Sequence, residues 1–253
     1  MSLRTYTLFP AAVLALACTS IPSNRILSPD LAVGRQLHMA LSEELHVPGG
    51  LRRTSGTFDL RVTGKTGDRY AFVATLHFGG RSVSANGTVD PLAHAVSLTS
   101  GDEETDGGSS GVSAFFESAF WGSPPPALSV GEHWTVALSK PWTYGPAGSQ
   151  TVTVTALDCR NDAVTLTAVG SGTGPTASQL EHPPETTAHV EGRVVHLPST
   201  YGPSTWKATV TLRHGITQEE HLVVRQLVKY GATDVTPAHS DTQELDLTLT
   251  RIE

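Results

Sequence analysis

Residues 57–78 decide the fold, and their sequence is TFDLRVTGKTGDRYAFVATLHF. Every second side chain is apolar in residues 58–62, and the same holds in residues 70–78. A period of two is typical of β-strands that bury one face. The stretch between them, residues 63–68, is rich in Gly and Thr and favours a turn. The sequence therefore predicts an antiparallel hairpin here.

The same alternation extends along most of the chain. It recurs in residues 83–89, 93–98, 134–138, 152–156, 164–168, 188–197, 206–212, 222–230 and 245–249. Val and Thr, which strands favour, are frequent in these segments. Because the connections are too short for parallel crossovers, neighbouring strands should pair antiparallel. We therefore expect an all-β fold, a single curved antiparallel sheet or half-barrel of about 11–12 strands, in one domain over residues 31–253.

Residues 31–45 fit two interpretations. Leu37, Leu41 and Leu45 have helical spacing, and the preceding Ser-Pro-Asp resembles a helix start. The same segment also alternates between apolar and polar residues, and Gly34 disfavours a helix. We favour a strand.

Residues 112–121 are expected to form the one substantial helix. Their apolar side chains fall on one helical face, and Gly122 and three prolines follow. Such a helix would cover the apolar face of the sheet. The apolar ligand site that this arrangement suggests consists of Phe115, Phe116, Phe120, Trp121 and Trp134.

The N-terminal region resembles an export signal. Residues 1–17 carry a basic residue near their start, Arg4. A short apolar run follows, and the segment ends close to small residues. The run is shorter than the roughly 20 residues that a membrane-spanning helix needs. The residues around Cys18 resemble a bacterial lipobox, which implies a lipidated Cys18, a flexible tether over residues 18–30 and anchoring through lipid alone. Ordinary cleavage after Ala17 is the alternative, and both stay open.

The chain is mildly acidic, with 17 Lys and Arg against 24 Asp and Glu and a formal net charge of −7. It has no basic cluster, which argues against nucleic acid as a partner. Its two cysteines are Cys18 and Cys159. If Cys18 carries lipid, Cys159 is an unpaired thiol, for which packing as a small apolar side chain is the usual role.

A short motif carries a family resemblance. It follows a proline-rich stretch and reads Val130-Gly131-Glu132-His133-Trp134-Thr135. This motif resembles one that recurs in uncharacterised bacterial exported proteins. Several of those proteins are similar to the periplasmic lipoprotein carriers. Together with the strand number and the mid-chain helix, the resemblance implies an antiparallel half-barrel that is closed by helices over an apolar cavity.

Two motifs near residues 101–111 suggest chemistry. Gly107-Gly108-Ser109-Ser110-Gly111 matches the Gly-x-Ser-x-Gly pattern of serine hydrolases, although no strand precedes it as the pattern requires. Asp102, Glu104 and Asp106 match part of a calcium-binding loop that lacks its closing Glu. The histidines have no metal-ligand spacing. We therefore expect neither a resident metal nor a cofactor.

Trp142, Tyr144, Tyr201 and Trp206 lie near Gly and Pro, where aromatic side chains either pack in a core or line a ligand site. Three functions remain open. The protein is a non-enzymatic cell-envelope lipoprotein that binds an apolar acyl or lipid ligand on the concave sheet face, or an envelope module for structure or protein interaction without a small-molecule site. The third and least favoured function is a hydrolase built on Ser109. In each case we expect export to the periplasm or the membrane surface.

Overall fold

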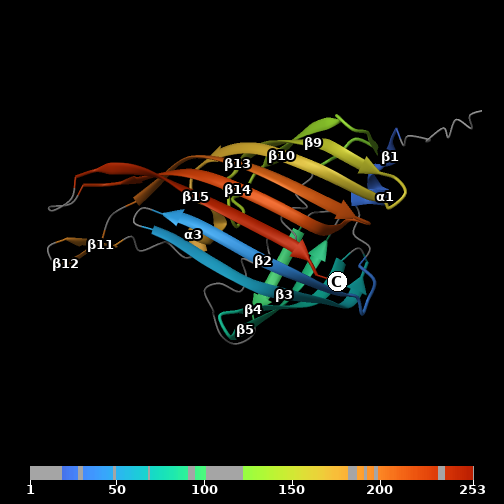
Figure 1. Ribbon diagram of the computed structural model, residues 1–253, viewed down its shortest axis with the longest axis horizontal. Coiled ribbons are helices and arrows are strands. Elements are labelled where there is room, and N and C mark those ends of the chain that lie inside the picture. Colours follow the sequence, from blue (N-terminus) through green and yellow to red (C-terminus); the bar gives the residue numbers. More distant parts are fainter. Residues whose placement is uncertain are drawn as a thin grey trace, which may run out of the picture.

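The computed structural model describes residues 19–27, 31–47, 50–67, 69–90, 95–100, 122–181, 187–190, 193–196, 199–232 and 237–252. Its main feature is an 11-stranded antiparallel sheet, which is strongly twisted and does not close into a barrel (Figure 1). The prediction of an all-β fold with one curved antiparallel sheet is therefore confirmed.

The chain enters the main sheet near its middle. Across the sheet the strands follow the order β6 (Ala95–Ser100), β5 (Arg81–Asp90), β4 (Arg69–Phe78), β3 (Gly50–Thr66), β2 (Gln36–Val47), β15 (His239–Arg251), β14 (Ile216–Tyr230), β13 (Ser199–Arg213), β10 (Ala163–Thr173), β9 (Gly148–Asp158) and β8 (His133–Leu138). The last strand, β15, lies between β14 and β2 and thus joins the two halves of the sheet (Figure 1).

Smaller elements flank the main sheet. They are β1 (Ile21–Pro22), which pairs with β7 (Ala127–Leu128), the short helices α1 (Ser23–Leu27) and α3 (Ala177–Glu181), and the hairpin of β11 (Thr187–Val190) and β12 (Arg193–His196). The β11–β12 hairpin projects away from the main sheet, and α1 lies near β9 and β10 (Figure 1).

The structure tests one of the two predictions about secondary structure, the one for residues 31–45, and does not test the one for residues 112–121. The segment with mixed character, residues 31–45, contributes β2, so the preferred strand interpretation is confirmed. The helix expected over residues 112–121 lies outside the described residues.

One face of the main sheet, the inner face, carries most of the buried apolar side chains. On β13, Trp206, Val210 and Leu212 are at most 3% exposed, and the residues that alternate with this face, Lys207, Thr209 and Thr211, point to the opposite, outer face. The buried side chains form one cluster centred on β2, β3, β4, β14 and β15 and a second centred on β8, β9, β10 and β13. Because each large apolar side chain contributes about 1.5–3 kcal/mol when buried, the inner face holds the sheet in its curved shape.

Part of the expected tether is folded onto this core. Ile21 of β1 and Ile26 of α1 are 3% and 0% exposed and belong to the second cluster. Arg25 forms an ion pair of 2.9 Å with Asp162 in the turn between β9 and β10. Residues 19–27 therefore belong to the folded domain and do not form a free linker ahead of it.

Gly170 in β10 leaves room for the indole of Trp206, its cross-strand partner on β13. A β-carbon at position 170 would lie 2.3 Å from Cε2 of that ring. Trp206 also donates its indole N–H to Oε1 of Gln150 over 3.0 Å, and both side chains are buried. Trp206 thus ties together β9, β10 and β13 on the inner face.

Gly170→Ala should destabilise the protein, because the added methyl group must displace a buried ring. Overpacking of this kind costs about 1–3 kcal/mol, which chemical denaturation would measure as a lower midpoint. Gly64→Ala is the matched control, since a β-carbon there meets only the β-carbon of Ala71 at 3.8 Å. Equal midpoints for the two variants would contradict the packing described for Trp206.

Candidate functional site

Most residues that the sequence singled out lie outside the described part of the chain. They are Phe115, Phe116, Phe120, Trp121, Asp102, Glu104, Asp106, Ser109 and Cys18. Trp134 is described, and its half-buried side chain packs from β8 against the second cluster. The predicted apolar ligand site is thus represented by one residue, and it stays a prediction.

The inner face, where an apolar ligand was expected, is packed with side chains over the described strands. Leu37 of β2 and Leu247 of β15 are 1% and 0% exposed. Near α3, Gln226 of β14 donates to the carbonyl of Gly174 over 2.8 Å and accepts from Nε2 of Gln179 over 2.8 Å. A ligand on this part of the inner face would have to displace side chains that are already buried.

The loop aromatics take part in the same packing. Trp142 meets Trp206 edge to face with ring centroids 5.7 Å apart, and it meets Tyr144 in the same manner at 6.3 Å. Tyr201 packs against a small cluster that contains Tyr230, and burial raises the pKa of the Tyr201 phenol. Of the two roles considered for these aromatics, core packing is the one that the structure contains.

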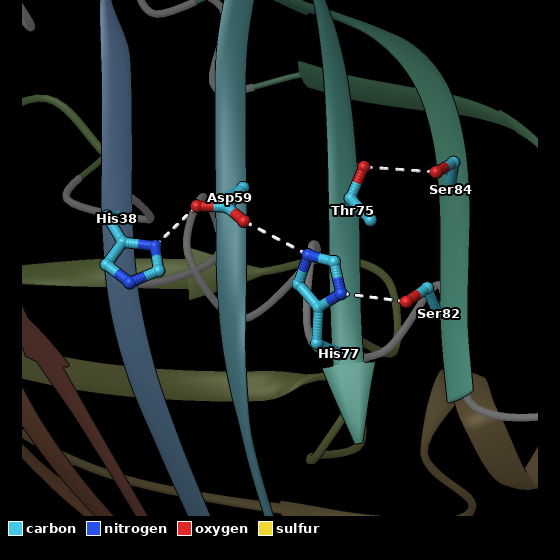
Figure 2. Close-up of polar contacts among 6 residues, drawn as sticks. All are labelled: His38, Asp59, Thr75, His77, Ser82 and Ser84. Carbon is cyan, nitrogen blue, oxygen red and sulfur yellow. Dashed lines mark hydrogen bonds and ion pairs between the residues drawn. The ribbon is translucent and has the colours of Figure 1, made fainter. Parts of the chain in front are cut away.

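On the outer face, a chain of polar contacts crosses β2, β3, β4 and β5 (Figure 2). Asp59 lies between two imidazoles. One of its carboxylate oxygens contacts Nδ1 of His38, and the other lies 3.1 Å from Nε2 of His77. Nδ1 of His77 in turn lies 2.8 Å from Oγ of Ser82.

A hydroxyl, an imidazole and a carboxylate in series can activate a serine nucleophile. Here, however, the side chains of His38, Asp59 and His77 are 43–48% exposed on an open strand face. Water screens such contacts, and each contributes little. We therefore interpret the series as a cross-strand ladder that supports the register of four strands. Within the described ranges, no group of three or more His, Cys, Asp or Glu side chains could hold a metal ion.

A larger feature of the outer face is a hollow of about 800 Å³ over β9, β10, β13 and β14, which we call the outer hollow. It is lined by Ser149, Gln150, Thr151, Val169, Gly170, Ser171, Thr205, Trp206, Lys207, Thr209, His221, Val223 and Arg225. All except Gln150, Gly170 and Trp206 are outer-face residues. Five of the lining residues carry hydroxyl groups and three have basic side chains, none is acidic, and more of the exposed lining is apolar than polar.

Lys207 lies in the middle of the outer hollow. It pairs across the sheet with Val169 on one side and Val223 on the other, so that its ammonium group emerges between two apolar side chains. Val169 is 55% exposed. No hydrogen bond or ion pair joins Lys207 to any other residue that the structure describes.

The other two basic residues of the outer hollow each have a carboxylate partner on β15. Arg225 forms an ion pair with Glu244, and Nε2 of His221 lies 3.0 Å from a carboxylate oxygen of Asp246. The positive charge of Lys207 is therefore the one left for a ligand, and the remainder of the lining offers hydroxyl groups and apolar surface.

Sequence analysis did not identify the outer hollow. Its residues are the polar half of the alternation that predicted the strands, and such residues usually face only water. Composition was the one signal in the sequence that could have pointed to this site. Residues 149–151, 169–171 and 205–209 combine hydroxyl side chains with one lysine and no acidic residue. The strand order that brings these three segments together with β14 cannot be read from that composition.

Cys159, at the start of the turn between β9 and β10, is disulfide-bonded, which differs from the unpaired thiol considered above. Disulfides form in oxidising compartments and are rare in the cytosol. Export itself stays a prediction.

No family model matches the chain, and neither curated proteins nor solved structures include one that matches it. The resemblance to the periplasmic lipoprotein carriers thus rests on the sequence motif, the strand number and the expected mid-chain helix, and it stays an expectation. No described helix is long and apolar enough to cross a bilayer.

Glu43 of β2 places a carboxyl group on the inner face, between Leu41 and Leu45 in the alternation. Burial raises the pKa of this carboxyl group above 4.5, its ordinary value. The folded protein therefore binds the proton of Glu43 more tightly than the unfolded chain does, and the ionised form is a source of instability at neutral pH.

Glu43→Gln should raise the thermal midpoint at pH 7, because it removes a charge that is costly to bury. The gain should shrink as the pH falls through the raised pKa of folded Glu43 toward 4.5, and it should be lost below 4.5, where wild-type Glu43 is protonated in both states. Glu44→Gln is the control, since Glu44 lies on the outer face with Oε1 2.7 Å from Nε of Arg53. A gain of equal size at pH 7 and pH 4 would contradict the burial argument.

Proposed function

We propose that this protein is exported and acts by binding, without catalysis, and that the outer hollow is its binding site. The ligand is an acidic saccharide of the cell envelope. The observation that carries this proposal is the chemistry of the lining, which combines many hydroxyl groups and one unpaired ammonium group with no carboxylate among the lining residues.

The chemistry of such a ligand matches the lining group by group. A uronate or phosphate group would accept a charge-assisted hydrogen bond from Lys207. Sugar hydroxyls would exchange hydrogen bonds with the Ser and Thr side chains, which both donate and accept. The C–H face of a sugar ring would rest on Val169 and Val223. The volume of about 800 Å³ lies within the usual range for ligand sites.

Charge strengthens the argument for an anion. The chain carries a formal net charge of −7, so a hollow lined by Lys207 and by no acid stands out against an acidic molecule. A local positive potential in a concave surface raises the concentration of an anionic ligand there. The attraction should weaken with salt, since charges in 0.15 M salt are screened over roughly 8 Å.

An apolar ligand on the inner face has less support. It needs vacant apolar surface, and the inner-face side chains of β2, β13 and β15 are buried against one another. An interaction module without any small-molecule site leaves the volume and composition of the outer hollow without a role.

Lys207→Ala should weaken binding of an oligogalacturonate probe about tenfold, as expected for loss of one charge-assisted hydrogen bond. Isothermal titration calorimetry measures this directly. Lys207→Arg should retain most of the affinity because it keeps the charge. The matched control is Lys229→Ala, which removes an exposed lysine of β14 from the same face of the sheet but outside the lining.

Three further binding results distinguish the candidate functions. Weaker binding of a neutral malto-oligosaccharide than of the acidic probe would support the proposed ligand class. No binding of the acidic probe to the wild-type protein would overturn the proposal. Uptake of a fluorescent fatty acid without any saccharide binding would instead support the inner-face interpretation.

A further inference from the structure

We propose that His221 is a second anion-binding residue of the outer hollow and that it acts only when its imidazole is protonated. The site would then distinguish acidic from neutral saccharides more sharply at mildly acidic pH. The inference rests on the function proposed above, since it concerns the same site and the same class of ligand. It is carried by the position of His221, which lines the outer hollow from β14 while its ring contacts β15.

His221 lies close enough to Lys207 for one ligand to contact both side chains. Thr209 is the direct partner of His221 on β13, and Lys207 lies two residues from Thr209 on the same strand. Such diagonal neighbours are about 7–8 Å apart, which is within reach of long side chains. Both residues line the outer hollow, and the side chain of His221 is 53% exposed. A ligand whose acid group lies at Lys207 can therefore also contact His221.

The contact with Asp246 determines which nitrogen of the neutral imidazole carries the proton. Nε2 of His221 lies 3.0 Å from Oδ1 of Asp246. Because an ionised carboxylate only accepts hydrogen bonds, the proton of the neutral ring lies on Nε2 and Nδ1 carries a lone pair. No other hydrogen bond or ion pair joins His221 to a residue that the structure describes. Nδ1 is thus the nitrogen that a ligand can use.

Protonation reverses the hydrogen-bonding role of Nδ1. In the neutral ring Nδ1 accepts, which suits a sugar hydroxyl group and disfavours an anionic oxygen. In the imidazolium both nitrogens donate, so Nδ1 can donate to a carboxylate or phosphate oxygen while Nε2 keeps its contact with Asp246. A charge-assisted hydrogen bond of this kind is roughly twice as strong as a neutral one. Protonation should therefore strengthen binding of an acidic saccharide and not of a neutral one.

The other charged groups around His221 do not compete for this role. Among the described residues, the charged side chains that face it are Lys207 of β13, Asp246 of β15 and Glu219 of β14, and its direct partners on β13 and β15 are both threonines. Ammonium and carboxylate groups ordinarily keep their charge between about pH 5.5 and pH 8, whereas imidazoles ordinarily change theirs in that range. A pH dependence of binding in that range therefore points to His221.

Calorimetric titration of the full chain at about pH 5.5 and pH 8, at constant ionic strength, tests the inference. The oligogalacturonate probe should bind about tenfold more tightly at the lower pH, as expected for one added charge-assisted hydrogen bond. A neutral malto-oligosaccharide should show no such gain, and an equal gain for it would overturn the inference. Equal affinity of the acidic probe at both pH values would also overturn it and leave the proposed function standing. Absence of binding at both pH values would overturn the two together.

Variants separate His221 from the other histidines. His221→Gln keeps a side-chain N–H for Asp246 but cannot become charged, so its affinity for the acidic probe should be the same at both pH values. His38→Gln is the matched control, because His38 is a 45% exposed strand residue that contacts Asp59 and lies outside the lining. It should keep the wild-type pH dependence. A tenfold change that persists in His221→Gln would assign the effect to another group and overturn the inference.

Proton uptake on binding provides a second measurement. If protonation of His221 strengthens binding, binding must favour protonation by the same factor. Titration near pH 6.5, about where imidazoles ordinarily change charge, in two buffers with different ionisation enthalpies measures this uptake. Wild-type protein should take up a fraction of a proton with the acidic probe, and His221→Gln should take up none. Binding of the acidic probe without proton uptake by the wild-type protein would contradict a role for the charge of His221.

Discussion

The pairing of β15 with β2 is the interaction on which the rest of the sheet depends. It sets Leu245 beside Leu45 and Leu249 beside Leu41, although these partners lie at opposite ends of the sequence. The larger buried cluster draws on β2, β3 and β4 from one side of this seam and on β14 and β15 from the other. Because so long a loop must close before the seam forms, the apolar contacts across it must compensate a large entropy cost.

The pairing of β15 with β2 also determines which side chains lie on the outer face. Alternation places every residue between two buried ones on the opposite side, so the register that aligns Leu247 with its neighbours also aligns Asp246 with Glu44 and with Val223. β15 thereby supplies the carboxylate partners of Arg225 and His221. The charge pattern of the outer hollow is thus a product of strand register, and Lys207 keeps its charge available because Val169 and Val223 are its neighbours.

The strands were predictable because their signal is local. The period of two in residues 57–78 is visible without any knowledge of partners, and it also settled residues 31–45 correctly in favour of β2. The outer hollow was not predictable, because its residues come from four strands and their grouping depends on order and curvature. The docking of Ile21 and Ile26 was missed for a related reason, since a segment rich in Pro and Ser gives no sign of the cluster it joins.

An open sheet has two borders, and here both are short. In the described part of the chain, β6 and β8 each have a neighbour on one side only, and each is six residues long, whereas β3 inside the sheet has 17. A bare strand border offers unpaired N–H and C=O groups to any other chain, which is how sheets fuse into aggregates. Short borders limit how many hydrogen bonds a second molecule can add. The sheet can therefore remain open at high protein concentration without polymerising edge to edge.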